Sequence, residues 1–404
     1  MNSHSTKHDP ALTLGMAAIV RLAYEGGDLE ALLGRLVARI EQDPADAAAL
    51  MDLYTLLQVT GQKDQALSMQ AMALSQRRIY HRPHGGGDGL KILAFVAPGD
   101  FMTNTPIDLL LEGTDLDLWL VFVDAGTTAL NDLPDHDVAF LAIGESAENM
   151  PILARIESLL ADWPKPIVNG APKAIAALTR DVVCQLFVNE PAIYAPTTVR
   201  VSRDALTALL RDDLPIQTVI PAGQFPLIIR PVGTHAGEGL EKIDDRPALA
   251  GYLVRHADPE FYLAPFIDYR GPDGLFRKQR IVFIEGRAYP SHFAVSEHWM
   301  VHYLSAKMTE LAERRAEEEA WMRDFDIDFA ARHAQAFAAL HRRLGLDYFG
   351  IDCAEMPDGR LLLFEADVAM VVHALDPDSI FPYKKPAMRR LFDAFAEAMA
   401  RRAA

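Results

Sequence analysis

Three carboxylates near the C-terminus have the residue types and the spacing of a cation-binding site. Asp352 lies in one apolar stretch, and Glu365 and Asp367 end the next. The Pro-Asp-Gly sequence between the stretches favours a turn, so we predict a β-hairpin. If residues 357–360 form a four-residue loop, Asp352 pairs with Glu365. Asp367 then lies on the same face, because side chains alternate along a strand.

The same loop length predicts the other pairs of this hairpin, Met356 with Leu361 and Ala354 with Leu363. Like charges directly opposite each other destabilise a sheet, so the three carboxylates need cations. Hard oxygen ligands close to phosphate suit Mg²⁺. The alternative is an acidic hairpin end exposed to solvent, but the apolar character of both strands argues against free exposure.

A second group of residues has the composition of a phosphate-binding loop. Arg230 ends an apolar stretch, and polar and glycine residues follow it: Gly233, Thr234, His235, Gly237 and Gly239. Glycines let the backbone bend sharply and approach a phosphate closely. The loop is not a P-loop, because no Gly-Lys-Ser/Thr closes it, and its glycine spacing is not that of a dinucleotide fingerprint. We expect a flap between two strands with Arg230 at its root; an ordinary glycine-rich hairpin is the alternative.

Residues 1–85 are predicted to be helical, because their apolar residues recur at helical spacing. Residues 26–32 align with residues 61–67 at an offset of 35. This spacing resembles the tetratricopeptide repeat, whose period is about 34 residues; a generic helical hairpin is the alternative. The segment has no cluster of catalytic residue types, so we expect it to dock a protein or peptide partner.

The pattern changes after a glycine-rich joint at residues 84–89. Apolar strands predicted at residues 91–96, 118–123 and 138–143 alternate with helices, which favours a parallel α/β sheet over residues 90–185. The rest of the chain is predicted to be α+β. Its expected strands are residues 226–230, 261–267, 280–284, 349–355 and 361–365.

The order of flap, hinge strand, arginine strand and carboxylate hairpin resembles the ATP-grasp superfamily. Within that superfamily the chain resembles the RimK-like glutamate ligases, over about residues 165–375. The resemblance implies two α+β subdomains that grip ATP, at residues 186–268 and 269–404. A parallel α/β pre-ATP-grasp domain and the repeat-like helical domain would precede them.

The resemblance also implies the roles of individual residues. Asp352, Glu365 and Asp367 would bind the Mg²⁺ ions that bridge the ATP phosphates. Arg280 matches the arginine that faces the γ-phosphate and the acyl-phosphate, and Arg230 would be the second catalytic cation. The implied nucleotide-binding residues are Arg180, Arg230, Gly233, Thr234, His235, Gly237, Gly239, Ala264, Pro265, Phe266, Asp268 and Lys278.

The chain departs from the family pattern at three positions. Arg230 stands where the family usually has lysine, and arginine can bind phosphate in a bidentate manner. Arg180 is the nearest candidate for the second lysine of the family, with Lys173 as the alternative. Asp367 stands where asparagine is more frequent, and it still supplies an oxygen ligand.

These residues predict an ATP- and Mg²⁺-dependent ligase that joins a carboxylate to an amine, with amino acid or peptide substrates. An ATP-grasp kinase and a non-catalytic nucleotide-binding adaptor are the alternatives. A formal charge of −17 argues against nucleic acid or an anionic membrane as the main partner. With two distant cysteines, no long apolar stretch and no secretory signal, we expect a cytoplasmic protein.

Overall fold

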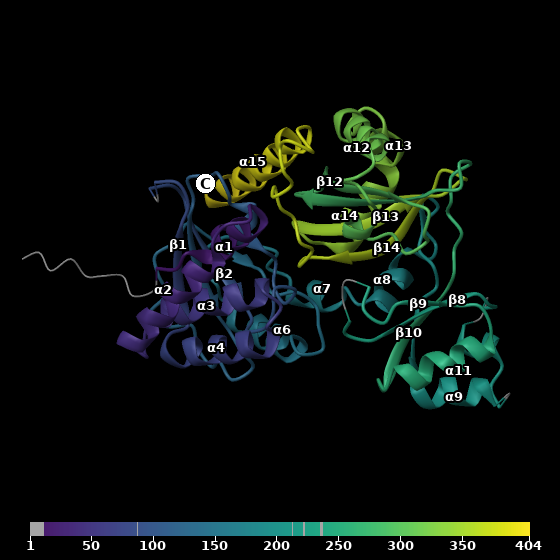
Figure 1. Cartoon of the computed structure of the whole chain (residues 1–404), viewed down its shortest axis with the longest axis horizontal. Helices are drawn as coiled ribbons and strands as arrows, with labels where there is room; N and C mark the ends of the chain where they lie inside the picture. The colour runs from purple at the N-terminus through teal and green to yellow at the C-terminus, as the bar shows by residue number, and fades with distance from the viewer. Residues whose placement is uncertain (1–11, 87, 212, 221–222, 235–236) are drawn as a thin grey trace, which may run out of the picture.

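The structure is a computed structural model that describes residues 12–86, 88–211, 213–220, 223–234 and 237–404. The described part of the chain begins with four helices (Figure 1): α1 (Gly15–Tyr24), α2 (Leu29–Gln42), α3 (Ala47–Val59) and α4 (Lys63–Gln76). The aligned segments of the sequence are equivalent turns, because Gly26 and Gly61 both adopt positive φ just before α2 and α4. Helices α3 and α4 pack against each other as a hairpin, whereas α1 and α2 each pack against α3. The assignment of the segment as tetratricopeptide repeats stays a prediction.

The first sheet has five strands in the order β1-β3-β2-β4-β5. They are β1 (Ile79–Pro83), β2 (Lys91–Val96), β3 (Asp117–Phe122), β4 (Val138–Leu141) and β5 (Ile167–Val168). Strands β2 to β5 form the predicted parallel sheet, and β1 adds an antiparallel edge next to β3. The short helices of this part are α5 (Ile107–Leu110), α6 (Met150–Leu159) and α7 (Pro172–Ala176), and the following α8 (Arg180–Phe187) packs against the third sheet described below.

The N-terminal helices and the first sheet share one hydrophobic core. Helix α3 is buried along almost its whole length, and its Leu50 packs in the same cluster as Tyr80 of β1 and Phe140 of β4. The C-terminal helix α15 (Lys384–Ala403) adds Phe395 to this cluster. A boundary at residue 85 thus falls after a strand that belongs to the following sheet, and the proposed division into domains remains untested.

The second sheet is antiparallel and has the order β7-β10-β8-β9. Its strands are β7 (Val199–Ser202), β8 (Leu227–Pro231), β9 (Glu241–Ile243) and β10 (Glu260–Pro265). The helices of this unit are α9 (Arg203–Leu210), α10 (Ile216–Val219) and α11 (Arg246–Arg255). Figure 1 shows α9 and α11 side by side below the sheet, and both contribute apolar side chains to its core.

The third sheet has the order β12-β11-β13-β14-β6. Its strands are β6 (Ile193–Tyr194), β11 (Phe276–Ile284), β12 (Arg287–Ser296), β13 (Tyr348–Glu355) and β14 (Leu361–Asp367). Its helices are α12 (Ala312–Asp324), α13 (Phe329–Arg332) and α14 (Ala334–Leu344), with a 3₁₀ turn, Tyr303–Ser305, before them. All five strands expected in the C-terminal part are present as β8, β10, β11, β13 and β14, so the α+β prediction is confirmed.

The predicted hairpin of β13 and β14 forms, but its loop has three residues and not four. The Met356 amide donates to the Arg360 carbonyl, at 2.9 Å. Gly359 adopts φ +83°, a left-handed conformation that closes the short loop at low cost for glycine. The predicted pairs of Met356 with Leu361 and of Ala354 with Leu363 are therefore wrong.

A β-bulge restores the predicted register beyond this point. Glu355 pairs with Leu361 near the loop, yet Asp352 pairs with Glu365 as predicted. The register shifts by one residue between these pairs and leaves Phe364 without a partner on β13. The bulge brings the two carboxylates opposite each other despite the shorter loop.

Both cysteines, Cys184 and Cys353, are buried and free. None of the helices within the described ranges is long and apolar enough to cross a membrane.

Candidate active site

Four cationic side chains from three structural units surround the open end of the carboxylate hairpin. Arg180 is the first residue of α8, and Arg230 lies near the end of β8. Lys278 and Arg280 lie two residues apart on β11, so they share a face of the third sheet. Arg180, Arg230 and Lys278 were predicted from the sequence as nucleotide-binding residues, and Arg230 and Arg280 as catalytic residues.

Asp352 binds two of these cations. The Arg280 Nε and Nη2 atoms donate to its two oxygens at 2.8 and 3.0 Å, and the Lys278 Nζ atom donates at 2.9 Å. Asp352 is only 3% exposed. Burial alone would raise the pKa of this carboxyl, but the adjacent Arg280 and Lys278 hold it well below its usual range. Asp352 is therefore an anion that fixes the direction of two cations.

Glu365 and Asp367 differ in their environments. Glu365 forms an ion pair with Arg180, which lowers the pKa of Glu365 against the opposing effect of burial. Burial raises the pKa of Asp367 to about 6, and the charge of Glu365 adds to that rise. One oxygen of Asp367 accepts from the Ala369 amide at 2.9 Å.

Among the described residues, no three His, Cys, Asp or Glu side chains gather closely enough to hold a metal ion. Asp352 points to Arg280 and Lys278, and Glu365 points to Arg180. The metal-binding roles of the three carboxylates stay predictions. The donor chemistry of Glu365 and Asp367, which is oxygen alone, is that of a Mg²⁺ ligand.

Arg230 is a buried cation for which the described part of the chain supplies no counter-ion. It is 8% exposed, and its guanidinium donates to the hydroxyl and carbonyl oxygens of Thr234. Within the described residues no carboxylate lies in ion-pair distance of it. Burial lowers the pKa of Arg230 to about 10, and the neighbouring Arg180 adds to the effect. The guanidinium groups of Arg180 and Arg230 repel each other, and that of Arg230 has no ion-pair partner among the described residues. A bound anion would therefore stabilise this arrangement.

The glycine-rich loop connects two antiparallel strands, β8 and β9, as the flap prediction requires. Gly233, Gly237 and Gly239 all adopt positive φ, at +82°, +82° and +63°. A Cβ atom on Gly239 would lie 2.6 Å from the Pro231 ring, whereas one on Gly233 would have no atom of the described residues within 4 Å. The predicted residue His235 lies outside the described residues.

The residues of the predicted hinge lie at the end of β10 and directly after it, and their role stays a prediction. Ala264 and Pro265 are the last residues of β10, and the following Phe266 amide donates to the Pro226 carbonyl at 3.1 Å. The Lys242 ammonium lies 4.8 Å from the centre of the Phe266 ring. Asp268, predicted to bind ribose, is paired with Arg270 in this structure.

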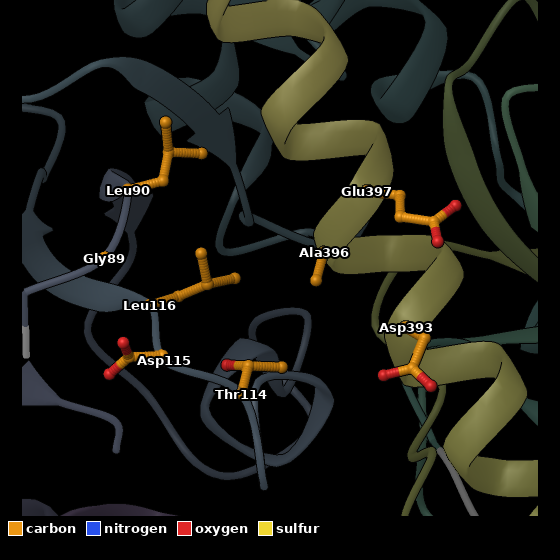
Figure 2. A pocket seen from close by; sticks show the side chains of 8 residues that line it. All are labelled: Gly89, Leu90, Thr114, Asp115, Leu116, Asp393, Ala396 and Glu397. Atoms are coloured by element: carbon orange, nitrogen blue, oxygen red, sulfur yellow. The ribbon is translucent and has the colours of Figure 1, made fainter. Parts of the chain in front are cut away.

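Two cavities lie outside the charged cluster. One of about 330 Å³ adjoins the hinge at Pro265 and is lined by Tyr194 and Arg360 among others. The other, of about 310 Å³, lies between loops of the first sheet and α15 (Figure 2). Its charged lining consists of Asp115, Asp393 and Glu397, so it does not suit a phosphate.

Two charged residues near the site were not found from the sequence. Glu145 follows β4, and the Asn149 side chain holds its loop by donating to the Gly144 carbonyl at 2.9 Å. Burial raises the pKa of Glu145 to about 7, with a contribution from the charge of Asp367. The position after a parallel strand is a common place for functional residues and could have identified Glu145.

Arg200 of β7 is the second such residue, and it donates to the Tyr262 hydroxyl at 3.0 Å. No motif marks it in the sequence. Lys173, the alternative to Arg180, is 84% exposed and pairs with Glu157, so Arg180 is the cation that joins the site.

One α+β unit carries the glycine-rich loop between two strands and the other carries the carboxylate hairpin, which is the arrangement expected from the resemblance to ATP-grasp proteins. No family model and no curated protein matches the chain. Solved structures do match. A RimK-domain ATP-grasp protein from Sphaerobacter thermophilus is 16% identical, with 76% of this chain and 99% of that chain covered and a TM-score of 0.41.

Two other solved structures are D-alanine–D-alanine ligases. The enzyme from Bacillus anthracis, complexed with ATP, is 13% identical and has a TM-score of 0.46, over 78% of this chain and 97% of that chain. The enzyme from Coxiella burnetii is 11% identical and has a TM-score of 0.48, over 78% and 96%. Similarities this low do not transfer residue roles, and the assignments above rest on contacts within this chain.

Proposed function

We propose that this chain is a cytoplasmic, ATP- and Mg²⁺-dependent ligase that joins a carboxylate to an amine through an acyl-phosphate. The observation that carries the proposal is the pair of guanidinium groups of Arg180 and Arg230. A buried cation without a counter-ion is costly, and a polyphosphate would supply the missing charge with bidentate hydrogen bonds. The similar ATP-grasp ligases are consistent with this reading.

Arg180, Arg230 and the charged residues around them would have different roles in phosphoryl transfer. Arg230 and Arg180 would bind the phosphates beneath the flap, and Lys278 and Arg280 would face the phosphoryl group that moves. Glu365 and Asp367 would hold Mg²⁺, which neutralises phosphate charge when bound. Asp352 keeps Arg280 in place throughout, because it binds the guanidinium through two hydrogen bonds.

The reaction has two steps. A carboxylate oxygen of the first substrate attacks the γ-phosphorus, and the bond to the β–γ bridging oxygen breaks, which releases ADP. The nitrogen of the amine then attacks the acyl carbon, inorganic phosphate leaves, and the nitrogen loses a proton. Arg280 would stabilise the negative charge that develops in both steps. The flap would exclude water, which otherwise hydrolyses the acyl-phosphate.

The domain organisation is part of the proposal. The units at residues 186–268 and 269–404 would grip ATP, the α/β unit at residues 90–185 would contribute to the substrate side, and residues 1–85 would dock a peptide or protein. The nucleotide base would lie against the hinge formed by Ala264, Pro265 and Phe266.

A non-catalytic nucleotide-binding adaptor is the second candidate. It is favoured by the ion pairs of Asp352 and Glu365, which occupy two of the three expected metal ligands. An adaptor would bind ATP through the same cations without releasing ADP.

An ADP-release assay with pooled amino acids and short peptides tests the proposal. We expect release that depends on both a carboxylate and an amine, and capture of the intermediate as a hydroxamate when hydroxylamine replaces the amine. Release that needs an alcohol substrate and gives no hydroxamate would indicate a kinase. Tight ATP binding without any release would indicate an adaptor.

A further inference from the structure

The segment between β14 and α15 is tied to three distant parts of the chain. We call residues 368–376 the connector. Its Val368 carbonyl accepts from the Thr105 hydroxyl at 2.8 Å. Its Val371 carbonyl accepts from the Arg280 Nη1 atom at 3.1 Å, and its Ala374 carbonyl accepts from Arg21 at 3.3 Å. The connector therefore links the N-terminal helix α1 to the arginine that would face the acyl-phosphate.

Arg21 is itself held in place. Its Nε atom lies 2.6 Å from a carboxylate oxygen of Glu112, which follows α5. This ion pair leaves the Nη2 atom directed at the connector, where it donates to the Ala374 carbonyl. A planar guanidinium with one edge fixed by a carboxylate has little freedom at its other edge.

A row of rings forms a parallel link. The Tyr24 ring of α1 lies 5.8 Å from the His373 ring of the connector, and His373 lies 5.1 Å from His292. His292 lies opposite Arg280 in the pairing of β11 with β12. The row ends at Lys384, whose ammonium lies 3.4 Å from the His292 Nδ1 atom.

The N-terminal end of α1 is also held by hydrogen bonds to buried side chains. Both oxygens of the buried Asp52 side chain accept from the Leu14 amide at 3.0 Å. The buried Asp108 side chain accepts from the Ala17 amide at 2.6 Å. Helix α1 is thus fixed at its N-terminus by α3 and α5, and at its C-terminus by the connector.

We infer that α1 positions the catalytic arginine, with Arg21 as the positioning residue. Arg21 holds the connector, and the connector carbonyl of Val371 fixes one edge of the Arg280 guanidinium while Asp352 fixes the other. The N-terminal helices would then serve the chemistry as well as any partner. The inference rests on the proposed function only in taking Arg280 to act on the acyl-phosphate.

Three variants test it. Arg21→Ala removes the contacts with Glu112 and the Ala374 carbonyl, together with a longer one to Glu25, and Arg21→Lys keeps the charge but loses the planar fork. Arg39→Ala is the matched control, because Arg39 of α2 forms an ion pair with Asp46 and touches neither the connector nor the site. Thermal denaturation of each variant establishes that it is folded.

The measurements are hydrogen exchange across residues 371–376, affinity for an unreactive ATP analogue, and ADP release. We expect Arg21→Ala to speed exchange in the connector and to lower the rate of ADP release by about tenfold, the effect of one lost charged hydrogen bond. Nucleotide affinity should not change, because Arg230 and Arg180 are untouched. Arg21→Lys should fall between Arg21→Ala and the wild type.

Connector exchange in Arg21→Ala that equals that of Arg39→Ala would overturn the inference. Nucleotide affinity that falls in step with the rate would also overturn it, since that pattern indicates general disruption. A wild-type protein that releases no ADP with any acceptor would refute the proposed function instead, and connector exchange would then decide the inference on its own.

Discussion

Replacement of Arg230 by methionine should change stability and nucleotide affinity in opposite directions. A pKa lowered from 12.5 to about 10 corresponds to about 3 kcal/mol in favour of the uncharged form. The charge therefore destabilises the nucleotide-free fold by up to that amount. Methionine removes the charge with little loss of volume, although the hydrogen bonds to Thr234 are lost, at about 1–2 kcal/mol.

The net expectation is a nucleotide-free protein that is more stable by about 1 kcal/mol, or roughly 2–4 °C in Tm. Nucleotide binding should weaken by about 1.5–3 kcal/mol, which is roughly tenfold to a hundredfold in Kd. Thermal denaturation without nucleotide and calorimetric titration with an unreactive ATP analogue and Mg²⁺ measure the two effects.

Arg203 of α9 provides the matched control in the same subdomain. Its guanidinium donates to the carbonyl oxygens of Asp258 and Leu253 at 2.9 and 3.0 Å, so its hydrogen bonds are well satisfied. Arg203→Met should lower Tm and leave Kd unchanged. The reasoning is refuted if Arg230→Met is less stable than the wild type without nucleotide and yet binds the analogue with wild-type affinity.

Three further predictions concern Glu365, the flap glycines and Asp52. Glu365→Gln should abolish ADP release, because Arg180 loses its ion-pair partner and a predicted metal ligand is removed. The far-UV circular dichroism should stay unchanged. Retained turnover would contradict the proposed site. Gly239→Ala should cost about 1–2 kcal/mol of backbone strain, and its new Cβ atom should also clash with Pro231. Gly233→Ala adds backbone strain alone. Gly239→Ala should therefore lose more nucleotide affinity than Gly233→Ala. Burial raises the pKa of Asp52 to about 6, so the contribution of this group to stability is present at pH 4 and lost as pH rises through 6. Chemical denaturation from pH 4 to 7 should therefore show a smaller decline in Asp52→Asn than in the wild type, and equal slopes would contradict this assignment.

Local patterns in the sequence were sufficient for eight strands and for the pairing of Asp352 with Glu365, whereas the long strand β12 was not among the expected strands. Alternation and turn chemistry are properties of neighbouring residues, so they can be read without a structure. The loop length was not predictable, because Pro-Asp-Gly fits both a three-residue and a four-residue connection. The loop is one residue shorter than predicted, and the bulge at Phe364 adds one residue to β14. The two changes cancel in the strand pairing, so Asp352 still lies opposite Glu365.

The partners of the charged residues were not predictable, because they come from distant parts of the chain. The three carboxylates were expected to share cations from solution, but Arg280 and Arg180 already pair with two of them. Glu145 reaches the site only because the first sheet packs against the end of β14. The Thr105 hydroxyl, for example, donates to the Val368 carbonyl 263 residues away. Contacts between residues so far apart cannot be predicted from the spacing of residue types along the sequence.

The bulge in β14 has a consequence for the comparison of this chain with others. The strand pairing near the loop, where Glu355 lies opposite Leu361, differs by one residue from the pairing at the site, where Asp352 lies opposite Glu365. Phe364 is the unpaired residue between these two parts of β14. Its ring lies 5.3 Å from that of Tyr269, so the extra residue is anchored by packing. A homologue with a four-residue loop and no bulge would carry the same number of residues between its two opposed carboxylates. An ungapped alignment would then match the acidic positions correctly while pairing loop residues with strand residues.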